Sequence, residues 1–138
     1  MRKFVYIVLC SVLFFSCSKE KESTVPSVPV NLRLDLDDPA NFQLNSVGGS
    51  MTIIGGNRGI IVYRRGLNEF SAIERTCSYQ STDTCAYVSI DSTISTVGCH
   101  CCGSRFQLLD GAPIKGPANA SLRLYQTNLI NRYLYIYN

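Results

Sequence analysis

Residues 99–106 read CHCCGSRF, a run that holds three of the chain's seven cysteines and its single histidine. Asp110-Gly111 follows, and then Gly116-Pro117-Ala118. Glycine and proline at these places are typical of turns. Cysteine thiols either pair as disulfides or bind metals, so the chemistry of this chain is concentrated in and around this run.

The sequence on either side of the run has the pattern of short β-strands separated by turns. Residues 30–36 alternate apolar and polar side chains, which predicts a half-buried strand. Residues 60–64 are β-branched and aromatic, which predicts a central strand. Further strands are expected at residues 42–45, 51–54, 69–73, 87–90, 105–109, 122–125 and 133–137. No segment has a convincing helical period, so the chain is predicted to be an all-β sandwich or barrel.

The first 16 residues predict a secretory signal peptide. Arg2 and Lys3 precede an apolar run at residues 4–15, which is too short to span a membrane as a helix. Ser16-Cys17 follows directly and is typical of a lipoprotein processing site, at which Cys17 would be acylated and become the first mature residue. Cleavage at a neighbouring position and an uncleaved anchor are the alternatives. We expect a protein bound to the membrane through Cys17, in the envelope of a gram-negative-type bacterium, on the periplasmic or outer surface.

Residues 17–29 are predicted to be the lipidated cysteine and a flexible tether, because they are charged and rich in Ser, Thr and Pro. Residues 30–138 then form one domain, long enough for a single core. Of the 13 basic residues, 11 remain without Arg2 and Lys3, and they nearly balance the 10 acidic ones. No basic patch stands out, which argues against a nucleic-acid partner.

Over residues 43–137 the sequence resembles the Rieske [2Fe–2S] proteins. Cys77 and Cys99 match the two cysteine ligands of that family, and Asp110-Gly111 matches the segment after the second ligand motif. Pro117 lies in the loop that shields the cluster in the family. The resemblance implies a Rieske-like antiparallel sandwich or barrel with two cysteine-bearing loops at one end. It also implies electron transfer with an envelope redox partner.

The same resemblance implies an altered set of ligands. In the family two cysteines hold one iron and two histidines hold the other. Tyr79 and Cys102 occupy the two histidine positions. Ser104 and Pro117 match residues that contact the cluster without binding iron: a hydroxyl that hydrogen-bonds a bridging sulfide, and the proline of the shielding loop. The implied metal ligands are Cys77, Cys99 and Cys102, with Cys85, Tyr79 or His100 as the candidate fourth ligand.

The resemblance further implies one disulfide. Cys101 matches a cysteine that binds no metal and that in some members pairs with a cysteine of the first loop. The matching partner would lie near residue 82, and Cys85 is three residues away. We therefore expect a Cys85–Cys101 bridge, which would remove Cys85 from the ligand set.

Three states of the remaining thiols stay open. A [2Fe–2S] cluster with altered ligands would make the domain an electron carrier. A cluster-free domain, in which Cys77 pairs with Cys99 and no cofactor is bound, would be a disulfide-stapled binding or assembly module. A single zinc ion on the same residues is the third. An enzyme is the least supported class, because the sole His100 has no evident partner for a catalytic triad and no phosphate-binding glycine loop precedes a helix.

Overall fold

The structure is a computed structural model, and it describes residues 25–91 and 95–138. The predicted signal peptide, Cys17 and the first part of the predicted tether lie outside these residues. Among the described residues there is no helix with the length and apolar character needed to cross a membrane.

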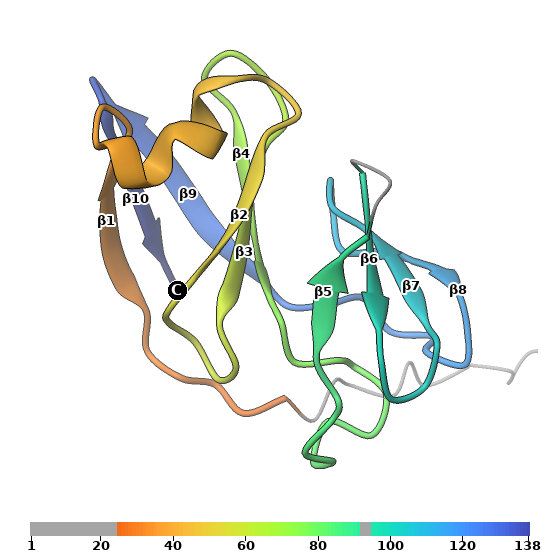
Figure 1. Cartoon of the computed structure of the whole chain (residues 1–138). Helices are drawn as coiled ribbons and strands as arrows, with labels where there is room; N and C mark the ends of the chain where they lie inside the picture. Colours follow the sequence, from red (N-terminus) through yellow and green to blue (C-terminus); the bar gives the residue numbers. More distant parts are fainter. Residues whose placement is uncertain (1–24, 92–94) are drawn as a thin grey trace, which may run out of the picture.

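The described chain forms two antiparallel sheets that lie beside each other (Figure 1). The larger sheet has the order β1-β10-β9-β4-β3-β2, with bounds Asn31–Asp35, Tyr133–Tyr137, Leu124–Ile130, Phe70–Glu74, Ile60–Arg64 and Ser50–Ile53. The smaller sheet has the order β5-β6-β7-β8, with bounds Val88–Ile90, Thr96–Cys99, Arg105–Gln107 and Pro113–Lys115. The predicted all-β, antiparallel architecture is confirmed, and the two cysteine-bearing loops lie at one end of the smaller sheet (Figure 1).

The central strands β3 and β4 separate two hydrophobic cores. Successive side chains of a strand point to opposite faces. Accordingly, Ile60 and Val62 pack in the core with Leu134 and Ile136, whereas Ile61 packs in the other core with Phe106. Burial on both faces explains why residues 60–64 read as a nearly continuous apolar run rather than an alternating one.

The predicted strand at residues 42–45 is wrong, because a 3₁₀ helix occupies Pro39–Asn45. Asp38 caps this helix by accepting a hydrogen bond from the Ala40 amide at 2.9 Å, and Pro39 stands in its first turn. Both residues favour the start of a helix. Leu44 is fully buried in the larger sheet's core, so the helix closes one end of that core (Figure 1).

Strands β6 and β8 were not expected, and β9 extends five residues beyond the segment predicted at 122–125. In β6 only Val97 and Cys99 are buried, and Gly98 interrupts the sequence pattern between them. Pairing with β5 and β7 on both sides places β6 in the sheet all the same. Strand pairing therefore overrides a weak local pattern here.

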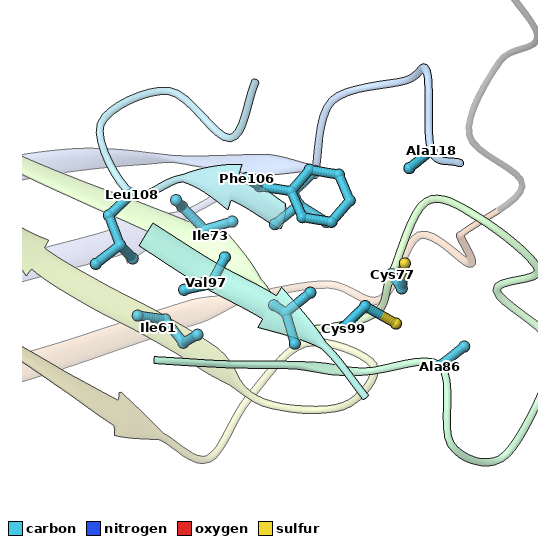
Figure 2. Close-up of a cluster of buried hydrophobic side chains, with 11 residues drawn as sticks. Ile61, Ile73, Cys77, Ala86, Val97, Cys99, Phe106, Leu108 and Ala118 are labelled. Atoms are coloured by element: carbon cyan, nitrogen blue, oxygen red, sulfur yellow. The ribbon is translucent and has the colours of Figure 1, made fainter. Parts of the chain in front are cut away.

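The smaller sheet covers a second core that contains the sulfurs. Cys77 and Cys99 belong to the same buried cluster as Val97, Phe106 and Leu108. Figure 2 shows the two sulfur atoms at one end of this cluster, near Ala86 and Ala118.

Candidate metal centre

Two loops bring the cysteines together at one end of the smaller sheet. The first, residues 77–87, follows β4, and the second, residues 100–104, joins β6 to β7 (Figure 1). The Cys77 amide donates to the Ala86 carbonyl at 2.9 Å, which closes the base of the first loop. The Cys99 amide donates to the Ser104 carbonyl at 2.8 Å, which closes the second. Because β5 pairs with β6 directly after the first loop, the two loops lie side by side.

Three sulfurs from these loops converge. The Sγ atoms of Cys77, Cys99 and Cys102 lie within 4.8 Å of one another, and those of Cys77 and Cys102 are 3.8 Å apart. Cys77 is fully buried, Cys99 is 4% exposed and Cys102 is half-buried. The structure thus brings together the three residues that were expected to be metal ligands. That they bind a metal remains a prediction.

Ser104 joins the sulfur group to the proline loop. The Cys102 thiol donates to Ser104 Oγ at 3.1 Å, and the same oxygen accepts from the Ala118 amide at 2.9 Å. Ser104 is fully buried, and Pro117, which directly precedes Ala118, is exposed. Ser104 therefore contacts the sulfur group directly, whereas the supporting role expected of Pro117 stays a prediction.

The environments of the thiols differ. Burial raises the pKa of Cys77, and the neighbouring Cys99 and Cys102 thiols raise it further. Partial burial also works against ionisation of Cys102, but the hydroxyl and amide of Ser104, together with the Cys99 and Cys77 thiols, outweigh it and lower the Cys102 pKa. Cys102 therefore ionises more readily than Cys77, because burial raises the pKa of Cys77 while Ser104 is the main group that lowers the pKa of Cys102.

The expected Cys85–Cys101 disulfide is present, with an S–S distance of 1.97 Å and a Cα–Cα distance of 5.3 Å. It ties the first loop to the second directly beside the sulfur group. Cys85 is thereby excluded as the fourth metal ligand.

Tyr79 and His100, the other two candidate fourth ligands, take other roles. Tyr79 is 36% exposed, and its backbone amide hydrogen-bonds to the Cys77 sulfur. His100 is exposed and lies against the Tyr87 ring, with ring centroids 5.7 Å apart. Within residues 25–91 and 95–138, the His, Cys, Asp and Glu side chains that meet at the site are the three thiols alone.

The cluster of the Rieske family does not fit this set of donors. Its second iron requires two imidazoles, and the described residues bring none to the sulfur group. Three converging thiols, two of them buried, do fit a metal ion that prefers sulfur.

Sequence reasoning missed one residue that shapes the first loop. Glu74 is fully buried at the end of β4 and accepts hydrogen bonds from the amides of Asn57, Arg58 and Thr76 at 2.8–3.0 Å. Tyr125 and the Thr76 hydroxyl donate to it as well. Glu74 thus fixes the chain three residues before Cys77. A single charged residue at the end of an apolar strand carries no sequence signal for this role.

The fold is similar to that of solved structures. The ferredoxin of carbazole 1,9a-dioxygenase from Nocardioides aromaticivorans superimposes with a TM-score of 0.53 at 21% identity, covering 80% of this chain and 98% of that one. A complex of reduced oxygenase and oxidized ferredoxin of carbazole 1,9a-dioxygenase gives a TM-score of 0.51 at 19% identity, covering 81% and 94%. At these identities the likeness establishes a Rieske-like fold, the fold of a ferredoxin.

By sequence, no family model matches this chain, and no curated protein matches it either.

Proposed function

We propose that this chain is an envelope lipoprotein whose Rieske-like domain carries a metal centre held by the thiolates of Cys77, Cys99 and Cys102. The observation that supports it is the convergence of three sulfurs from two loops within 4.8 Å, with Cys77 and Cys99 buried. The thiolate is the metal-binding form of cysteine. Burial makes a free Cys77 thiolate unfavourable, and a bound cation removes that cost.

The envelope location rests on the predicted signal peptide and on Cys17, followed by a polar tether. The Cys85–Cys101 disulfide supports it, because disulfides persist in exported proteins and are rare in the cytosol. The lipid on Cys17 would be the membrane anchor.

An electron-transfer role is supported by the fold, since the most similar structures described above are ferredoxins, one of them in complex with an oxygenase. The partner proposed for this chain is an envelope redox protein. Cys102 is half-buried, so one ligand lies near the surface, where an electron could pass to such a partner. This role requires a centre that changes oxidation state.

The metal centre is tested on mature protein purified anaerobically from membranes in detergent, by elemental analysis, sulfide assay and thiol counting. We expect the purified protein to contain bound metal. After the metal is removed, the thiols of Cys77, Cys99 and Cys102 should become accessible to a thiol reagent. Cys77→Ala and Cys99→Ala should lose the metal, whereas a Cys85→Ala/Cys101→Ala double variant should keep it. Metal-free protein with three free thiols would contradict the proposal.

The anchor is tested separately by fractionation. Cys17→Ala should move the protein from the membrane to the soluble fraction of the envelope, and wild-type protein labelled with a palmitate analogue should carry the label. Unlabelled wild-type protein in the soluble fraction would rule out lipidation.

A second candidate, the cluster-free binding or assembly module, is favoured by one distance. The sulfurs of Cys77 and Cys102 are 3.8 Å apart, so a small movement would bring them to bonding distance. Peptide mapping without reduction distinguishes the two functions. A Cys77–Cys102 or Cys77–Cys99 disulfide in metal-free protein isolated from cells supports the module.

A further inference from the structure

The distances between the sulfurs bear on how many metal ions the site holds. This inference rests on the metal centre proposed above and specifies it. We infer that Cys77, Cys99 and Cys102 bind one thiophilic ion, Cu(I) or Zn(II), rather than a [2Fe–2S] cluster.

The spacing of the sulfurs matches a single ion. Two thiolates bound to one ion at about 2.3 Å are about 3.8 Å apart in a tetrahedral site and about 4.0 Å apart in a trigonal one. The sulfurs of Cys77 and Cys102 lie 3.8 Å apart, and all three lie within 4.8 Å of one another. One ion can therefore reach all three with only small side-chain adjustments.

A two-iron cluster needs a different arrangement of donors. Each iron takes two protein ligands, so the two ligand pairs stand at opposite ends of the cluster. The described residues provide one compact group of three sulfurs and no second pair facing it. Cys85 is held in the disulfide and His100 lies against Tyr87, so neither completes a second pair.

The class of ion follows from the donors. Thiolates are soft ligands that bind Cu(I), Zn(II) and iron–sulfur clusters, and the arrangement of the donors argues against the cluster. Three thiolates alone complete a trigonal Cu(I) site, and zinc bound by three protein ligands takes a water as its fourth. Cys102 is half-buried, whereas Ala86 and Ala118 pack in the buried cluster with Cys77 and Cys99 (Figure 2). For zinc, the water would therefore bind on the Cys102 side.

The test uses reduced, metal-free mature protein, in detergent and under anaerobic conditions. Three separate samples receive Zn(II), Cu(I) with a competing chelator, or ferrous iron with sulfide. Bound metal and sulfide are then measured per chain. Alkylation followed by mass spectrometry identifies which thiols are protected in each sample.

The expected result is one Zn(II) or one Cu(I) per chain, with Cys77, Cys99 and Cys102 protected and no stable uptake of iron and sulfide. The sample that binds at lower free metal concentration identifies the ion, and a preference for Zn(II), which has no redox chemistry, would overturn the electron-transfer role while leaving the single-ion site standing. Two irons and two sulfides per chain would overturn the inference, as would two Zn(II) or two Cu(I) ions per chain. Each of these results would leave the proposed metal centre standing. Binding in none of the samples would overturn both.

Matched variants separate ligands from neighbouring sulfurs. Cys99→Ala should raise the apparent dissociation constant for the ion by more than about 100-fold, beyond the range typical of residues that only support a ligand. Cys85→Ala/Cys101→Ala removes two sulfurs beside the site and should still bind one ion. Because a ligand variant can fail to fold, the thiol protection measured in wild-type protein decides the question by itself. An unprotected Cys77, Cys99 or Cys102 in the loaded protein refutes the three-thiolate site.

Discussion

The hydroxyl of Tyr125 donates a 2.7 Å hydrogen bond to the buried carboxylate of Glu74. Among the described residues, no basic side chain forms an ion pair with that carboxylate. Backbone amides from residues 57, 58 and 76 supply further donors. A buried carboxylate is costly unless its oxygens are hydrogen-bonded. Here the donors come from a glycine-rich loop, from β9 and from Thr76 directly before the first cysteine loop, so one side chain connects all three.

Glu74→Gln should lower the free energy of unfolding by about 1.5–3 kcal/mol, the scale of hydrogen bonds to charged groups. Glutamine has nearly the same shape, but its NH₂ group would face donors instead of accepting from them. The measurement is urea unfolding at neutral pH. Glu69→Gln is the matched control, because Glu69 is exposed, and its effect should stay within about 0.5 kcal/mol. Equal effects of the two variants would contradict the role of Glu74.

Stability should also depend on pH through Glu74. Burial acts to raise the pKa of Glu74, but the hydrogen bonds from Asn57, Tyr125, Thr76 and Arg58 outweigh it and lower the pKa below the ordinary 4.5. The folded state then binds fewer protons than the unfolded state, so this stabilisation is complete above pH 4.5 and is lost as pH falls through the folded pKa. Unfolding of wild type and Glu74→Gln between pH 7 and pH 3 should show a difference that shrinks on acidification. A constant difference would contradict the lowered pKa.

Much of the fold could be predicted from local pattern. Residues 30–36 and 60–64 have enough alternation or β-branching to specify β1 and β3 by themselves. The pattern failed at residues 42–45, where the cap at Asp38-Pro39 decides the conformation of the apolar residues after it. It failed again at Thr96–Cys99, because that strand is defined by its neighbours in the sheet rather than by its own side chains.

The site was predictable where spacing carries the information and unpredictable where packing does. The resemblance to the Rieske family, carried by Cys77 and the 99–104 run, implied the three neighbouring sulfurs and the Cys85–Cys101 bridge that the structure contains. Glu74 could not be found in this way. Its burial depends on Asn57 and Tyr125, which only the folded chain brings to it.

Removal of the disulfide should destabilise the domain without removing its ligands. The bridge closes a loop with a sequence separation of 16, for which about 3 kcal/mol is expected from the reduced entropy of the unfolded chain. Cys85→Ala/Cys101→Ala should lower the free energy of unfolding by about 2–4 kcal/mol. Unfolding of wild type under reducing conditions provides the control, and should approach that of the variant. Unchanged stability in both would show that the bridge has no energetic role.

Gly56→Ala should be more damaging than Gly103→Ala, although both glycines have positive φ, at 62° and 74°. A side chain in this region costs about 1–2 kcal/mol through its backbone conformation alone. A Cβ at Gly103 meets nothing within 4 Å, whereas at Gly56 it would collide with Glu74 and Tyr125. We expect the loss of stability for Gly56→Ala to be about twice that for Gly103→Ala or more, measured by urea unfolding with a chelator present. Equal losses would mean that the side chains of Glu74 and Tyr125 move away from the added Cβ without a cost in stability.

Ser104→Ala should weaken the metal centre while leaving its three sulfurs in place. Groups that orient a ligand typically contribute about 10–100-fold to metal affinity, and Ser104 contacts both Cys102 and the Ala118 amide. The same change should raise the pKa of Cys102, since Ser104 is the main group that lowers it. Alkylation of Cys102 in metal-free protein should therefore move to higher pH, a shift that a loss of stability alone does not produce. Ser46→Ala, an exposed serine outside the site, is the control and should change neither the affinity nor the alkylation profile. An unchanged profile in Ser104→Ala would show that the Ser104 hydroxyl does not stabilise the Cys102 thiolate.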